Sequence, residues 1–216
     1  MSTSRAVGRG IGTVVAALAR VRSTDKPMHP RGTVHRGTLR RTGVADPVAG
    51  SGSPFLDTAG VDPVVVRVSR SVGLPRPWPD VNGLAIRVPT PDGPADLLLN
   101  GTGRGRLGRF VLAPSTRGVG RFCTTLLPLA SPSGPVLVAA EPVGPLAWRL
   151  LWAPAWSRAS AWRVFGRLEL APAEEAEDVD VTFDPAAGAP PGLTVPAWQR
   201  ELRAPSYAAA RRARGA

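Results

Sequence analysis

The amino-acid sequence predicts an α+β fold, in which an antiparallel β-barrel of about eight short strands is flanked by N- and C-terminal helices. Two observations predict the barrel. Short runs rich in Val, Leu and Ile recur through the middle of the chain, and turn residues separate them, in a chain with 24 glycines and 24 prolines. A third observation predicts the helices, because apolar residues recur at helical spacing near the N-terminus and Trp198 opens an Ala- and Arg-rich segment near the C-terminus.

The length and composition favour a single folded domain. The chain has 216 residues, of which 43% are hydrophobic and 20% are charged, enough to bury one sizeable core. We expect a domain over residues 1–216, made of an N-terminal helix (1–25), the barrel core (26–171), a linker (172–197) and a C-terminal helix (198–216).

The N-terminal segment is expected to be a short helix that packs on the domain. Its apolar run, residues 11–18, is too short to span a bilayer, and Arg20 and Arg22 follow without a small-residue cleavage site. Cys123 is the single cysteine, so no intrachain disulfide can form, which fits a reducing compartment. We therefore expect a cytoplasmic protein without membrane association.

The strands are expected where apolar residues alternate or cluster between turn signals such as Asp92-Gly93 and Ser133-Gly134. The expected strands are 32–41, 62–72, 82–88, 95–100, 110–113, 124–129, 136–141, 146–152 and 162–170. The acidic run 174–180 is expected to be a solvated loop, and 185–196 an extended linker. In the C-terminal helix Pro205 should cause a kink or a restart.

The charge is strongly positive, with a formal net charge of +11, and Lys26 is the only lysine among 27 basic residues. Two interpretations stay open. Arginine in place of lysine, with abundant Ala, Gly and Pro, is typical of a GC-rich coding sequence. The same charge would also attract an anion, such as nucleic acid, anionic lipid or a carboxylate-bearing cofactor.

Several motifs for other chemistries are absent or incomplete. The segment 103–108 matches GxGxxG, but a strand and not a helix is expected after it, so we interpret it as a flexible loop. His29 and His35 are the only histidines, too few for a multi-histidine metal centre. No GxSxG nucleophile elbow is present, so a hydrolase or phosphodiesterase has little support.

Five separated stretches, in order, carry a family resemblance. They are His29-Pro30-Arg31-Gly32, Val66-Arg67-Val68-Ser69, Asp80-Val81-Asn82-Gly83-Leu84-Ala85-Ile86-Arg87, Asp96-Leu97-Leu98-Leu99-Asn100 and Arg203-Ala204-Pro205-Ser206-Tyr207. Together they resemble the core of haem catalases, in which H-A-K-G precedes a V-R-F-S strand, a D-x-x-G-x-A-x-K/R strand, D-L-x-x-N and a later R-x-x-S-Y. The resemblance implies a catalase-like barrel that binds b-type haem.

The resemblance also implies a peroxide site on one side of the haem. His29 would be the general base and then the general acid, and Asn100 would hold the peroxide by a hydrogen bond. Ser69 would hydrogen-bond the imidazole and fix its orientation. Ser71 falls where the family lines the same pocket.

On the other side, the resemblance implies that Tyr207, the only tyrosine, is the axial iron ligand, as tyrosine is in catalase. Arg203, one helical turn earlier, would lower the pKa of its phenol. Three cations, Lys26, Arg67 and Arg214, match positions that meet haem propionates.

Some positions depart from the family pattern. Lys26 stands where arginine is usual, Pro30 replaces a small residue, Ala209 replaces an acidic residue, and Arg211, also placed at the cofactor, stands where histidine is common. The chain is also shorter than a typical catalase, so we expect a more open pocket that favours peroxidase chemistry.

The expected function is therefore haem-dependent peroxide reduction, of the peroxidase or catalase-like type. The expected partners are a peroxide and a small organic electron donor, with a homodimer left open. Three alternatives remain: a non-catalytic haem carrier or sensor, a haem enzyme that rearranges hydroperoxides, and a basic nucleic-acid-binding barrel with Gly/Arg loops on phosphates. Among the possible partners, nucleic acid has the least support from the sequence.

Overall fold

The computed structural model describes residues 31–44, 50–70, 78–116, 121–156, 162–172, 181, 183–184 and 188–201. The chain forms two compact units. One comprises Met1–Met28 and Pro196–Ala216, of which residues 196–201 are described. The other is His29–Val195, which contains all the strands described below and the candidate site.

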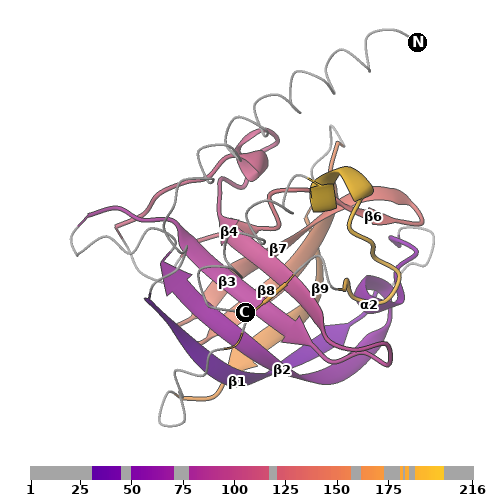
Figure 1. Cartoon of the computed structure of the whole chain (residues 1–216), viewed down its shortest axis with the longest axis horizontal. Helices are drawn as coiled ribbons and strands as arrows, with labels where there is room; N and C mark the ends of the chain where they lie inside the picture. Colours follow the sequence, from indigo (N-terminus) through magenta and orange to yellow (C-terminus); the bar gives the residue numbers. More distant parts are fainter. Residues whose placement is uncertain are drawn as a thin grey trace, which may run out of the picture. The chain divides into compact units, whose positions relative to one another are not determined.

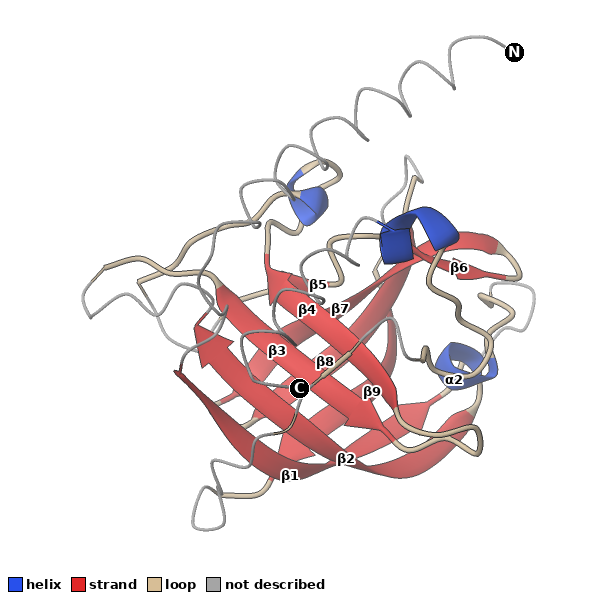
Figure 2. Ribbon diagram, viewed as in Figure 1, coloured by secondary structure: helices blue, strands red, loops and turns tan. Residues whose placement is uncertain are grey.

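An antiparallel sheet closes on itself in the larger unit (Figure 2). Its first four strands are β1 (Arg31–Thr42), β2 (Ala59–Arg70), β3 (Asn82–Val88) and β4 (Ala95–Gly101). The ring continues through β5 (Cys123–Thr124), β7 (Gly134–Gly144), β8 (Ala147–Pro154) and β9 (Arg163–Leu170), which pairs with β1. A short strand, β6 (Leu129–Ser131), pairs with β7 outside the ring. The expected antiparallel barrel of about eight strands is confirmed, and closure leaves these strands without a long free edge.

The expected α+β class with flanking helices was wrong. The described part of the chain is dominated by strands, and its two named helices lie between strands: α2 (Pro54–Asp57) and the 3-10 helix η3 (Gly108–Phe110). Near the C-terminus only residues 197–201 are described as helical, and the rest of the expected end helices falls outside the described residues. The barrel needs no covering helix for its backbone, because each strand of the ring hydrogen-bonds to a neighbour on both sides.

The barrel interior is filled by side chains that alternate along each strand. On β2 the inward residues include Val64 and Val66, and on β8 they are Trp148, Leu150 and Trp152, all at most 3% exposed. This period of two is the geometry of a β-strand, in which successive side chains point to opposite faces. Residues between the inward ones therefore face outward, and on β7 and β8 several of them, including Leu137 and Leu151, are themselves buried. No helix of the described residues is long and apolar enough to cross a membrane.

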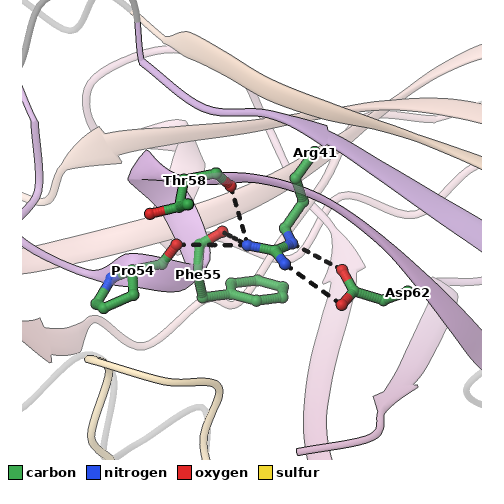
Figure 3. Close-up of polar contacts among 5 residues, drawn as sticks. All are labelled: Arg41, Pro54, Phe55, Thr58 and Asp62. Carbon is green, nitrogen blue, oxygen red and sulfur yellow. Dashed lines mark hydrogen bonds and ion pairs between the residues drawn. The ribbon is translucent and has the colours of Figure 1, made fainter.

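One end of the barrel is held together by Arg41 at the end of β1 (Figure 3). Its guanidinium donates to both carboxylate oxygens of Asp62, at 2.7 and 3.3 Å, and to the carbonyl oxygens of Pro54, Phe55 and Thr58 around α2. The guanidinium also lies 5.3 Å from the centroid of the Phe55 ring. One guanidinium thus binds carbonyl groups of α2 and the Asp62 carboxylate together, so Arg41 fastens α2 to strands β1 and β2.

The segment after β9 returns to the barrel. Leu193 and Val195 are 4% and 8% exposed and belong to the interior cluster, although 185–196 was expected to be an extended linker. Thr194 and Ala130 exchange backbone hydrogen bonds of 2.9 Å, and the Phe55 amide donates to the Pro191 carbonyl. Residues up to 195 are therefore part of the barrel unit.

Candidate functional site

Three of the predicted site residues are described, and they lie on two strands of the barrel that a single strand separates. Arg67 and Ser69 are on β2, and Asn100 is near the end of β4. The strand between them, β3, pairs Gly83 with Ser69 on one side and with Asn100 on the other. Ser69, Gly83 and Asn100 therefore form one row across three adjacent strands, which Figure 1 shows side by side.

This row faces away from the barrel interior. Val66 on β2, and Leu97 and Leu99 on β4, belong to the interior cluster. Because side chains alternate along a strand, Ser69 and Asn100 point to the opposite, outer face. Paired residues on adjacent strands lie on the same face, with Cβ atoms about 5 Å apart. The row thus places a hydroxyl and an amide on either side of a glycine that contributes no side chain.

The same row continues onto β1 through Gly32, which pairs with Ser69. A Cβ atom at position 32 would lie 2.7 Å from Nε of Arg67 and 3.0 Å from the Cβ atom of Ser69. A side chain at position 32 would therefore displace the Arg67 side chain and crowd Ser69. The absence of a side chain at Gly32 leaves the space in which Arg67 lies across β1, and this brings a cation beside the polar row.

Further along the outer face, the resembling motifs contact one another. Arg87 of β3 and Asp96 of β4 are direct partners, and the Arg87 guanidinium donates to both carboxylate oxygens of Asp96, at 2.8 and 2.6 Å. This hydrogen bond raises the pKa of Arg87 despite an opposing effect of burial. The Asp184 amide also donates to Asp96, at 2.7 Å, and the Phe183 ring lies 4.9 Å from the Arg87 guanidinium. Arg87 and Asp96 therefore have a structural role, because they bind each other and hold residues 183 and 184 against the barrel.

The Gly/Arg segment after Asn100 is ordered by contacts that the sequence did not indicate. The Gly103 amide donates to the Gly108 carbonyl at 3.0 Å, and η3 follows. The strand expected at 110–113 is absent apart from a single bridge between Leu112 and Thr102, because η3 runs to Phe110. The Thr124 hydroxyl, on the residue paired with Asn100, donates to the Arg109 carbonyl at 2.8 Å. These hydrogen bonds hold the loop that follows Asn100 in one conformation. The helix in this loop, η3, has three residues and is too short to form a dinucleotide-binding site.

Arg109 is the residue in this segment that sequence reasoning missed. Its side chain is fully buried, the guanidinium lies 4.8 Å from the centroid of the Trp162 ring, and burial lowers its pKa. Arginine is mostly exposed in proteins, so no signal in the sequence separates Arg109 from its neighbours. Arg104, in the same segment, forms an ion pair with Glu141.

The remaining predicted site residues are Lys26, His29, Ser71, Arg203, Tyr207, Arg211 and Arg214, and they lie outside the described residues. The other histidine, His35, is buried, and its Nδ1 atom lies 3.3 Å from the Ala171 carbonyl oxygen, a structural contact. Within the described ranges, no group of three His, Cys, Asp or Glu side chains could hold a metal ion.

Comparison with known proteins supports the fold. No protein-family model matches the chain, and no curated protein matches it. A solved structure of a bacterial catalase matches with a TM-score of 0.57 and 15% sequence identity, over 93% of this chain. The match covers 59% of the length of that catalase chain. The chain therefore has a catalase-like fold.

Proposed function

We propose that this protein is a haem-dependent oxidoreductase that reduces peroxides, by peroxidase or catalase-like chemistry. The observation that carries the proposal is the outward row of Ser69, Gly83 and Asn100, with Arg67 held beside it over Gly32. The catalase-like fold supports it, because the row combines residues from three of the stretches that resemble haem catalases.

The described residues fit one face of a haem. A haem is a flat apolar ring with two carboxylate groups at one edge, so it needs a surface of small residues with a cation at its border. Gly32, Gly83 and Ala85 supply small residues on the outer face, and Arg67 supplies a cation that could pair with a propionate. The carboxylate of Asp96, two rows further along the outer face, is paired with Arg87.

His29 can reach this face. It precedes Gly32 by three residues, so its Cα atom lies no more than about 11 Å from that of Gly32. Gly32 is the direct cross-strand partner of Ser69. The proposed hydrogen bond from the Ser69 hydroxyl to the imidazole of His29 is therefore within reach of the chain, and it would fix which ring nitrogen carries the proton.

The proposed division of labour follows from the resemblance to haem catalases, together with the positions of Arg67, Ser69 and Asn100. His29 removes a proton from the bound peroxide and returns it to the departing oxygen, while the Asn100 amide holds the peroxide in place. Tyr207 would bind the haem iron through its phenolate oxygen, and Arg203 would stabilise that phenolate by its charge. Lys26, Arg67 and Arg214 would bind the propionates, Arg211 would also contact the cofactor, and Ser71 would line the peroxide side. The haem iron, when bound, supplies the electron transfer to the peroxide.

The first test is the visible absorption spectrum of the protein purified from cells supplied with haem. We expect a Soret band with a high-spin ferric pattern typical of tyrosinate ligation. Tyr207→Phe should lose that pattern and retain less haem, because phenylalanine cannot bind iron. A colourless protein that also fails to take up added haem would contradict the proposal.

The second test concerns the peroxide side. His29→Ala should bind haem as the wild type does but lose most peroxide turnover, since general acid–base catalysis contributes about 10²–10⁴-fold. Asn100→Ala should raise the KM for peroxide more than it changes haem content. His35→Ala is the matched control, because that imidazole contacts Ala171 away from the row. Full activity in His29→Ala would overturn the assignment, and haem binding without any turnover would indicate a carrier or sensor.

A further inference from the structure

A row of arginines crosses the outer face of the barrel on strands β1, β9 and β8. Arg40 of β1 is the direct partner of Arg167 of β9, which in turn is the direct partner of Arg149 of β8. The three residues, called the arginine row below, are all exposed, with side-chain exposures of 57% for Arg167 and 51% for Arg149. Neighbouring members are about 5 Å apart at Cβ, so the row spans about 10 Å.

This arrangement works against folding stability. Like charges directly opposite on adjacent strands repel one another and destabilise a sheet. Two glutamates relieve the repulsion only in part: Glu169 pairs with Arg167 at 2.8 Å, and Glu141 pairs with Arg149 at 3.4 Å but is shared with Arg104. The side chain of Arg40 makes no hydrogen bond or ion pair with any described residue. A local cost to stability that no contact within the barrel explains is typical of a functional surface.

We propose that the arginine row is a docking surface for the phosphate backbone of a nucleic acid. One DNA strand carries a phosphate about every 3.4 Å along the helix axis, so the row, about 10 Å long, matches about three successive phosphates. The planar guanidinium presents paired donors that suit phosphate oxygens, whereas lysine is a point charge. No base-reading group is proposed, so binding should be independent of sequence.

A membrane surface fits the row less well. Basic segments that lie on lipid also present exposed Trp, Phe or Leu side chains that insert among the acyl chains. The exposed tryptophans of the described residues, Trp78, Trp156 and Trp198, are on none of strands β1, β8 and β9. The exposed apolar residues nearest the row in the pairing are valines, with Val61 opposite Arg40.

The test compares two triple variants of the full chain that lose the same net charge. The row variant is Arg40→Gln, Arg149→Gln and Arg167→Gln. The control variant is Arg106→Gln, Arg121→Gln and Arg200→Gln, which are exposed arginines on other segments. Fluorescence anisotropy with a labelled 20-base-pair DNA, read from 50 to 200 mM NaCl, gives affinity and its salt dependence, and thermal unfolding gives stability.

We expect the wild type to bind at 50 mM NaCl and the row variant to lose at least tenfold in affinity. The slope of log K against log salt should fall by about 2.7, because each of three lost phosphate contacts contributes about 0.9. The control variant should change affinity by less than about threefold, because its three arginines lie outside the arginine row and make no phosphate contacts in this proposal. The row variant should unfold at the same temperature as the wild type or a higher one, because repulsion is removed.

Four results would overturn the proposal. They are absence of DNA binding by the wild type at 50 mM NaCl, an equal loss in both variants, and binding to vesicles containing 30% phosphatidylserine without DNA binding. The fourth is DNA binding that appears only after the acidic run 174–180 is neutralised, which would make that segment the occupant of the row. None of these outcomes depends on haem content, so the result is separate from the test of the proposed peroxide chemistry.

Discussion

The single cysteine shows how a buried position changes the chemistry of one residue. Cys123 lies on β5 in the barrel interior at 3% exposure, and its thiol donates to the Arg121 carbonyl at 3.3 Å. Burial raises the pKa of this thiol from 9.0 to about 12, because the thiolate would lose its hydration. The thiolate is the reactive form, so Cys123 is a structural residue in the folded protein.

This burial predicts slow labelling of the native thiol. At pH 8 the aromatic disulfide reagent DTNB should react at least about a hundredfold more slowly with the native protein than with the urea-unfolded protein, because the native thiol is buried and its raised pKa leaves little thiolate. The same shift predicts a pH effect on stability. The neutral thiol is favoured in the folded state, so its contribution is complete below pH 9 and is lost as pH rises towards 12.

The labelling experiment compares the native and the urea-unfolded state of the same chain. For the effect of pH on stability, the control is Cys123→Ala. Its free energy of unfolding, measured in urea, should decline less between pH 9 and the highest pH at which the protein still folds reversibly. A native thiol that is labelled as fast as the unfolded one would show that β5 opens readily.

At the scale of elements, α2 depends on one arginine more than on its own hydrogen bonds. The helix has four residues, and such a short helix has no stability of its own in water. Arg41 donates five hydrogen bonds to it and to Asp62, and the side chains of this ion pair are 14% and 19% exposed. The position of α2 is therefore set by β1 and β2.

Arg41→Ala should lower the free energy of unfolding by about 2–4 kcal/mol, because Asp62 and three carbonyl groups lose a charged partner. Arg40→Ala is the matched control, since Arg40 is the next residue on the same strand, is exposed and points to the opposite face. It should change stability by less than about 0.5 kcal/mol. Equal effects in urea denaturation would mean that the Arg41 contacts add no net stability.

At the scale of the whole barrel, closure involves a segment that follows the last strand. Leu193 enters the interior cluster, and Thr194 bridges to Ala130 of β6 by backbone hydrogen bonds. Residues far apart in the chain thus share one core, so the barrel and residues 188–195 should unfold in one transition.

Leu193→Ala should destabilise the barrel by about 2–5 kcal/mol, the range for removing a buried leucine side chain. Thr194→Ala should cost less than about 0.5 kcal/mol, because its side chain is exposed and its backbone bridge remains. Tryptophan fluorescence and far-UV circular dichroism should report the same transition for both variants. An early, separate loss of one signal in Leu193→Ala would show that the segment is only loosely attached.

Much of the strand pattern could be predicted from the sequence. The strand expected at 82–88 is β3, and the strand expected at 95–100 is β4 with one further residue. Alternating apolar residues and the Asp92-Gly93 turn are local features, so the strands that they predict depend little on contacts with distant residues. The strand expected at 124–129 is instead divided between β5 and β6, because Leu126 adopts a positive φ of 61°. That conformation costs a leucine energy, so only the surrounding structure can impose it.

The candidate site, too, could be predicted only in part from the sequence. Its residue types came from motifs that lie along separate strands: Arg67 and Ser69 in one, Asn100 in another. Nothing local shows that Gly83 lies between Ser69 and Asn100, or that Gly32 leaves room for Arg67. The sequence by itself determined where most of the strands form, such as β3 and β4, and which residues carry the resemblance to haem catalases. The tertiary structure decided the cross-strand rows, the burial of Arg109 and the position of α2, because strand register and packing depend on contacts between residues that are distant in the chain.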